Sequence, residues 1–63
     1  MKRDARTLYN RIVKKAENKK AAGGTFTVCE NIPKEYQEDI QEELKANGYQ
    51  LHFGNSFAFW VTW

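Results

Sequence analysis

The most reactive side chains in this chain are its single cysteine and its single histidine, Cys29 and His52. A cysteine beside a histidine can form a reactive thiolate, which is the nucleophile of several enzyme classes. In the predicted sheet both side chains point to the outer face, but a third strand lies between their strands and holds them roughly 10 Å apart. We therefore expect a buried or half-buried cysteine and a solvent-facing histidine. With one residue of each type, neither a disulfide nor a metal cluster is expected.

Carboxylates gather on the predicted second helix. They are Glu35, Glu38, Asp39 and Glu42. Acid–base catalysis would need a pocket around such groups, whereas these positions form an exposed ridge. The ridge can dock on a basic protein surface, imitate the phosphates of DNA, or lie beside the first helix and be partly neutralised by it. We favour neutralisation over mimicry because the whole chain is not acidic. No catalytic residue and no cofactor is predicted, and the chain is expected not to be an enzyme.

Basic side chains gather on the predicted first helix. They are Arg3, Arg6, Arg11, Lys14 and Lys15. Residues 1–22 carry eight Lys or Arg against two acids, a net +6, whereas residues 23–63 carry two against six, a net −4. A row of cations on one helix can follow a phosphate backbone, so nucleic-acid binding is one hypothesis. A solvated helix surface is the simpler interpretation.

Residues 57–63 are the most informative stretch, because four of the seven are aromatic. Alternation places Phe57, Phe59, Val61 and Trp63 toward the core and Trp60 on the opposite face. If both helices cover the core side, Trp60 lies at the centre of an open surface. That surface would comprise Thr25, Thr27, Gln50, His52, Ala58, Trp60 and Thr62. Aromatic anchors of this kind often contribute ≥ 2 kcal/mol to binding. If the first helix covers this face instead, Leu8 and Ile12 pack on Trp60, which is then ordinary core.

The elements that position these groups follow from periodicity. The first helix is expected from about Lys2 to Glu17 or Asn18, ended by Gly23-Gly24, and a strand over 25–29 should point Phe26 and Val28 inward. The second helix begins near Pro33 and buries a narrow stripe of three residues. The stripe is Tyr36, Ile40 and Leu44. This second helix is expected to end at Asn47-Gly48, with Tyr49 folding back on its last turn. A strand over 49–53 follows. A three-residue turn over 54–56 would pair Phe53 with Phe57, Leu51 with Phe59 and Tyr49 with Val61.

Together these elements predict one small α+β domain over residues 1–63, in the order α-β-α-β-β. Two strand orders are possible. The last strand is apolar on both faces and is placed at the centre of a three-stranded sheet, a split β-α-β arrangement with two helices, because a simple sequential order would leave this aromatic-rich strand at an exposed edge. A chain of 63 residues buries only ~60% of its unfolded surface, so a homodimer is a possible source of further support. No apolar run approaches the roughly 20 residues of a membrane span, and the charged start Met1-Lys2-Arg3-Asp4 does not have a signal-peptide pattern. A cytoplasmic protein without a membrane partner is therefore expected.

The C-terminal half, residues 32–63, has a helix ending Leu44-Lys45-Ala46-Asn47-Gly48-Tyr49 and a hairpin closing on Trp60-Val61-Thr62-Trp63. This pattern loosely resembles very small phage-encoded α/β proteins. The resemblance covers about half the chain, rests on generic structural residues and transfers no functional residue. It implies a small non-enzymatic protein that binds and modulates a host factor, or that serves in gene regulation or assembly, in the host cytoplasm if it is phage-encoded. The predicted function is thus a protein-binding module acting through the Trp60 face or the acidic helix; the alternative is a nucleic-acid-binding protein with Trp60 as a stacking residue.

Overall fold

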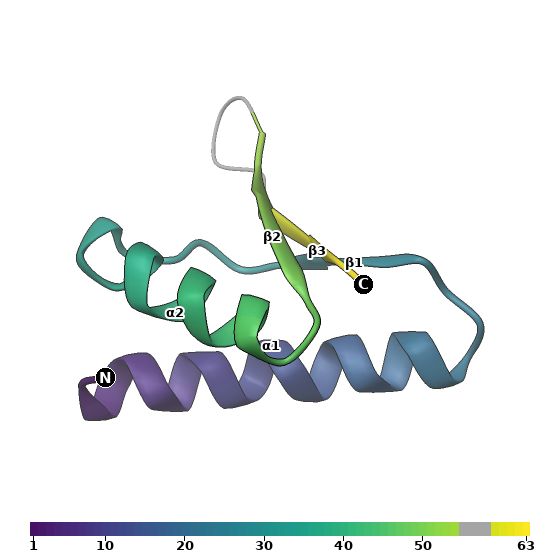
Figure 1. Cartoon of the computed structure of the whole chain (residues 1–63), viewed down its shortest axis with the longest axis horizontal. Helices are drawn as coiled ribbons and strands as arrows, with labels where there is room; N and C mark the ends of the chain where they lie inside the picture. Colours follow the sequence, from purple (N-terminus) through teal and green to yellow (C-terminus); the bar gives the residue numbers. More distant parts are fainter. Residues whose placement is uncertain (55–58) are drawn as a thin grey trace.

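The computed structural model describes residues 1–54 and 59–63. Within them the chain forms two helices and three strands in the predicted α-β-α-β-β order (Figure 1). The elements are α1 (Arg3–Ala21), β1 (Phe26–Cys29), α2 (Lys34–Ala46), β2 (Gln50–Phe53) and β3 (Phe59–Thr62). The mixed α+β class predicted from the sequence is confirmed.

Helix α1 is longer than its sequence pattern indicated. The prediction ended it at Glu17 or Asn18, whereas the structure continues it to Ala21. Its final turn is held by two backbone hydrogen bonds, from the Gly23 N–H to the Lys20 carbonyl (3.0 Å) and from the Gly24 N–H to the Lys19 carbonyl (2.9 Å). Gly23 makes this ending possible because its φ of 87° lies in the left-handed region that favours glycine. The Lys20 ammonium also lies 6.0 Å from the centre of the Tyr49 ring, at the limit of a cation–π contact.

Helix α2 begins and ends where the sequence indicated. Pro33 directly precedes it, and its last turn closes with hydrogen bonds from the Gly48 N–H to the Lys45 carbonyl (3.2 Å) and from the Tyr49 N–H to the Leu44 carbonyl (2.9 Å). Gly48 adopts a φ of 84°. The predicted glycine exit, with Tyr49 folding back on the last turn, is confirmed.

The three strands form an antiparallel sheet in the order β1-β3-β2, so the apolar last strand is central, as predicted. The predicted pairing of β2 with β3 is wrong by two residues: Phe53 lies opposite Phe59 and Leu51 opposite Val61. A shift of two residues keeps every side chain on the same face, so alternation cannot distinguish the two registers. The rings of Phe53 and Phe59 meet edge to face, 5.2 Å apart, which favours the observed pairing. Phe57, the partner that the prediction gave to Phe53, lies outside the described residues.

Strand β1 presents the opposite face from the predicted one. Phe26 and Val28 are 50% and 56% exposed, whereas Thr27 and Cys29 are 4% and 7% exposed. Thr27 lies opposite Val61, on the side of the sheet that holds the core. Because α1 packs against β1, short side chains at the inward positions leave room for the helix. The prediction that Phe26 and Val28 point inward is therefore wrong.

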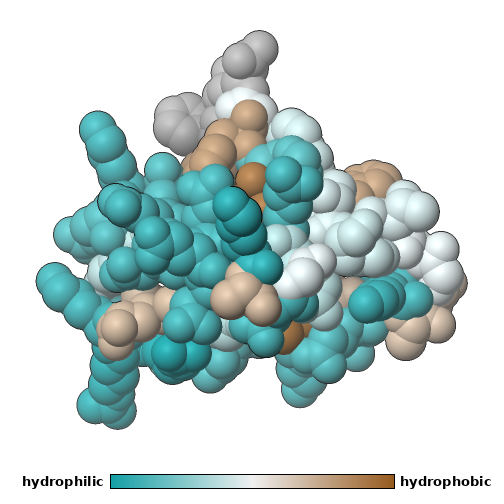
Figure 2. Space-filling view, viewed as in Figure 1, coloured by the Kyte–Doolittle hydropathy of each residue, from teal (hydrophilic) through white to brown (hydrophobic). Residues whose placement is uncertain are grey.

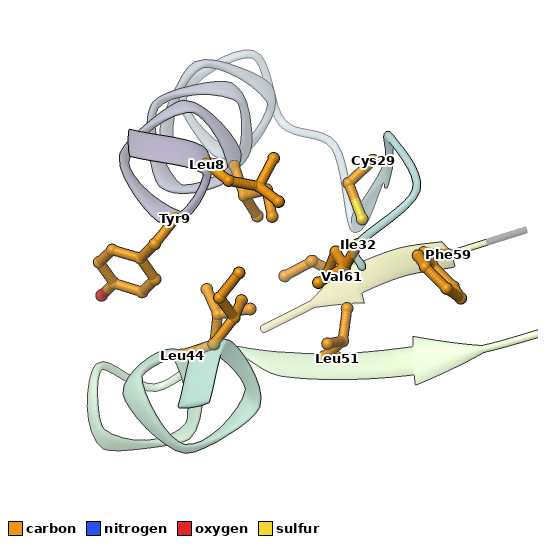
Figure 3. Packing of buried hydrophobic residues seen from close by; sticks show 10 residues of the cluster. Leu8, Tyr9, Cys29, Ile32, Leu44, Leu51, Phe59 and Val61 are labelled. Carbon is orange, nitrogen blue, oxygen red and sulfur yellow. The ribbon is translucent and has the colours of Figure 1, made fainter. Parts of the chain in front are cut away.

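Both helices lie on one side of the sheet, with α1 against β1 and α2 against β2, and the two helices also contact each other. The buried side chains fill the space between the helices and the strands (Figure 3). They are Leu8, Tyr9, Ile12, Cys29, Ile32, Ile40, Leu44, Leu51, Phe59 and Val61. Leu8 and Ile12 thus pack on the Val61 side of the sheet, and the structure selects the arrangement in which neither helix lies on the face of Trp60.

Tyr9 ties the two helices together at the edge of this core. Its hydroxyl accepts a hydrogen bond from the Asn47 side-chain amide (2.8 Å), and the Arg6 guanidinium lies 5.5 Å from the centre of its ring. Burial raises the pKa of the Tyr9 phenol, and the nearby Glu43 carboxylate raises it further. The Tyr9–Asn47 contact fixes the end of α2, from which β2 starts.

Candidate functional site

The side of the sheet away from the helices is called the outer face. It comprises the strand side chains Phe26, Val28, Gln50, His52, Trp60 and Thr62. Strand pairing arranges them in two rows of three, with a β3 residue in the middle of each row. Thr62 lies between Phe26 and Gln50, and Trp60 lies between Val28 and His52. Trp60 is therefore near the centre of the face, as the sequence predicted.

The half of the outer face beside β1 is apolar. Phe26 and Val28 are among the most exposed large hydrophobic side chains of the described residues. Together with Trp60 they surround a shallow hollow of about 580 Å³. Its lining residues are Thr25, Phe26, Val28, Phe59, Trp60 and Thr62. Its lining comes from β1, from Thr25 just before it, and from β3, so the hollow lies over these two neighbouring strands.

The half of the outer face beside β2 is polar, and His52 there contacts both Trp60 and Thr62. The His52 ring stacks on Trp60 with 5.4 Å between ring centres and 10° between planes. Its Nε2 lies 2.8 Å from the Thr62 Oγ1, within hydrogen-bond distance. One side of Trp60 is thus held by the stacked His52 ring, while β1 and the hollow lie on its other side.

Cys29 and His52 do not meet. Cys29 is buried on the helix side of the sheet and His52 is on the outer face, so the expectation that both point outward is wrong for Cys29. Burial raises the pKa of the Cys29 thiol, against the lowering effect of Lys15. A raised pKa keeps the thiol protonated and unreactive. Within residues 1–54 and 59–63, no three Cys, His, Asp or Glu side chains gather as metal ligands would.

The basic side chains of α1 lie on the opposite side of the sheet from Trp60. All five predicted positions are exposed, and two of the arginines contact carboxylates: Arg6 Nη2 lies 3.9 Å from Glu43 Oε1, and Arg11 Nη1 lies 3.6 Å from Glu30 Oε1. Lys14 and Lys15 line a hollow of about 390 Å³ between α1 and β1, together with Arg11. The structure therefore does not bring the basic helix and the tryptophan together on one surface.

The acidic ridge of α2 is also separate from the outer face. Glu35, Glu38, Asp39 and Glu42 are all exposed. Asp39 and Glu42 line a hollow of about 260 Å³ near Met1, and neighbouring Glu43, which is outside the ridge, makes the contact with Arg6. In Figure 2 hydrophilic side chains crowd the part of the surface over α2 and the start of α1, while hydrophobic areas there are small and separate.

Sequence reasoning found four of the six outer-face residues and missed Phe26 and Val28. It had assigned Thr25 and Thr27 to the face in their place; Thr25 does line the hollow, but Thr27 is buried. Ala58 lies outside the described residues. The sequence of β1 alternates apolar residues with threonine and cysteine, and this pattern does not show which of the two faces the helices cover. No other signal in the sequence indicated which face of β1 points inward.

Among the residues that the structure describes, neither helix is long and apolar enough to cross a membrane. Comparison of the chain with models of known protein families, with characterised proteins and with solved structures finds no match.

Proposed function

We propose that this protein is a non-enzymatic protein-binding module whose binding surface is the outer face of the sheet. The observation that carries the proposal is the group formed by Phe26, Val28 and Trp60, two exposed hydrophobic side chains and a tryptophan around one hollow. Apolar groups of this kind mark interaction sites in soluble proteins. Aromatic side chains in hollows are also the residues that most often dominate binding free energies.

The chemistry of the face favours a protein over a nucleic acid. None of its six side chains is Lys, Arg, Asp or Glu. Nucleic-acid binding needs cations close to the phosphates, and stacking on Trp60 would leave the backbone without them because α1 lies across the sheet. The alternative, nucleic-acid binding by Arg3, Arg6, Arg11, Lys14 and Lys15, would have to use α1 without Trp60. Docking through the acidic ridge of α2 is a second protein-binding surface of the proposal.

The resemblance of residues 32–63 to small phage-encoded proteins supports a further part of the proposal, that the partner is a host protein. A small protein with an uncharged and partly apolar sheet face suits a cytoplasmic modulator that occupies a surface of a host protein. In this role the face supplies the contact, and the charged helices on the far side keep the small domain in solution.

Capture from cell extract tests the proposal. The tagged protein is compared with a variant in which Phe26→Lys and Val28→Lys are combined, and with a control in which Arg11→Ala and Lys14→Ala are combined. Each pair comprises two exposed residues, so circular dichroism should show the same fold in all three proteins. We expect the bound partner to be lost in the face variant and kept in the control.

The opposite result would contradict the proposal. If the face variant captures the same partner as the original protein, the outer face is not the binding surface. If capture is lost in the control and the captured material is a nucleic acid released steeply by salt, the alternative function is correct.

A further inference from the structure

We infer that the outer face binds an extended, uncharged segment of a partner protein, which pairs with the free edge of β1 and places an apolar side chain in the hollow beside Trp60. This inference rests on the proposed function and names the kind of partner. Four features of the described residues support it: the edge of β1, the hollow, the size of the face and its lack of charge.

Strand β1 is an edge strand with few of the usual protections against pairing. In residues 1–54 and 59–63 it pairs only with β3, so its other edge presents backbone N–H and C=O groups to a further strand. It contains neither Lys nor Pro, the residues that commonly block edge pairing, since its sequence is Phe-Thr-Val-Cys. The other edge strand, β2, adjoins the side of Trp60 that the stacked His52 ring occupies, whereas β1 adjoins the hollow. Edge pairing is therefore expected at β1.

The hollow lies where a strand added to β1 can fill it. Alternate side chains of an added strand point to the same face as Phe26 and Val28. One of these side chains would reach over β1 into the hollow of about 580 Å³, against Trp60. A volume in this range is typical of pockets that hold small ligands, ~300–1,000 Å³. Backbone pairing would thus supply the alignment, and the hollow would supply selectivity for an apolar side chain.

The face is too small to hold a second copy of this chain by surface contact. Strands of four residues at ~3.4 Å each, in three strands ~4.8 Å apart, give a face of roughly 14 by 14 Å, or about 200 Å². Stable protein interfaces bury about 800 Å² on each partner. A peptide segment does not need that area, because it gains backbone hydrogen bonds along the edge of β1.

The absence of charge on the face selects the side chains of the segment. A charged side chain in the hollow would lose its hydration without an opposite charge among the six outer-face residues. An aromatic or aliphatic side chain loses nothing of this kind and buries apolar area. The segment is therefore expected to be uncharged at the positions that face the hollow.

Peptide selection provides the probe. A display library of random twelve-residue peptides is selected on the whole protein, and the selected sequences are synthesised. We expect aromatic or aliphatic residues at alternate positions, without charges between them. Peptide binding should slow hydrogen exchange of the β1 amides and leave those of β2 unchanged. Failure of the library to yield a binder, or protection of β2 instead of β1, would overturn the inference.

Two chemical changes separate strand pairing from a simple apolar contact. Methylation of a peptide nitrogen that pairs with β1 should weaken binding at least about tenfold, and methylation one residue away should not, because only alternate groups face the neighbouring strand. Equal effects at both positions would contradict pairing.

The second change is in the protein. Phe26→Ala should weaken peptide binding at least about 30-fold. Phe53→Ala is the control for loss of an exposed phenylalanine, since Phe53 is 44% exposed against 50% for Phe26, is in the other edge strand and contacts Phe59 on the opposite face.

The outcome is distinguishable from failure of the proposed function. If the Phe26→Lys, Val28→Lys variant loses its cellular partner but the selected peptides do not protect β1, the face binds proteins by another geometry and only the inference fails. If the variant keeps its partner, the part of the proposed function that places binding on the outer face fails as well, and the acidic ridge of α2 is left as the binding surface. Sedimentation of the free protein gives an independent result: a dimer that dissociates when Phe26→Lys is introduced would assign the face to a second copy and overturn the inference.

Discussion

The inner face of the sheet carries Leu51 and Val61 beneath two helices, whereas the outer face carries Phe26, Val28 and Trp60 with no covering element among the described residues. In β1 the larger apolar side chains are on the uncovered side, and Thr27 and Cys29 are on the covered one. Burial of the β1 side chains is therefore decided by fit against α1 rather than by side-chain hydrophobicity. The apolar group left outside has no structural reason visible in the described chain, which is why it supports a binding role.

Adjacent residues of β1 provide the strongest test of this difference. We expect the native Cys29 thiol to react with iodoacetamide at least about 100-fold more slowly than a cysteine introduced by Val28→Cys in a Cys29→Ala background. Cys29 is 7% exposed and Val28 is 56% exposed, and burial raises the pKa of the Cys29 thiol. Reaction of Cys29 requires local opening, and an opening free energy of ~2.7 kcal/mol already slows it about 100-fold. Mass spectrometry after timed quenching measures both rates.

Similar rates for the two thiols would show that the faces of β1 are assigned wrongly. The same reaction in a denaturant that unfolds both proteins is the control, because the two rates should then converge. A persistent difference in the unfolded state would trace the effect to the local sequence instead of to burial.

Two valines on opposite faces test the energetics of the comparison. Val61→Ala and Val28→Ala remove the same two methyl groups, but Val61 is fully buried in β3 and Val28 is exposed in β1. We expect Val61→Ala to lower the free energy of unfolding by about 2–3 kcal/mol, from lost burial and the cavity it leaves. Val28→Ala should lower it by less than about 0.5 kcal/mol. Urea denaturation of both variants measures the difference, and equal losses would mean that something covers Val28 in the folded protein.

Some of the molecule could be predicted from the sequence because several physical signals agreed. The helix faces followed from the 3.6-residue period of residues such as Leu8 and Ile12, and the end of α2 followed from Gly48. The central position of β3 followed from its two apolar faces. In each case burial and backbone chemistry favoured the same arrangement.

The remainder depended on contacts that the sequence does not encode locally. The register of β2 against β3 was open by two residues, because such a shift changes no side-chain face. The face of β1 was decided by the packing of α1 against the strand, which neither element specifies alone. For this reason Trp60 and His52 were identified as candidate site residues, while Phe26 was not.

Within the outer face, His52 and Gln50 allow a smaller and more specific comparison. Both are on the same side of β2, but His52 stacks on Trp60 and contacts Thr62, whereas Gln50 is exposed. We expect His52→Ala to lower the free energy of unfolding by about 1 kcal/mol, because a cross-strand aromatic pair is lost, and Gln50→Ala by less than about 0.5 kcal/mol. In a Trp63→Phe background, where Trp60 is the only tryptophan, His52→Ala should also change the emission of Trp60 and raise its quenching by acrylamide. Equal stability and unchanged emission in the two variants would show that His52 does not hold Trp60, and the wall of the hollow would then have to form on binding instead of being present beforehand.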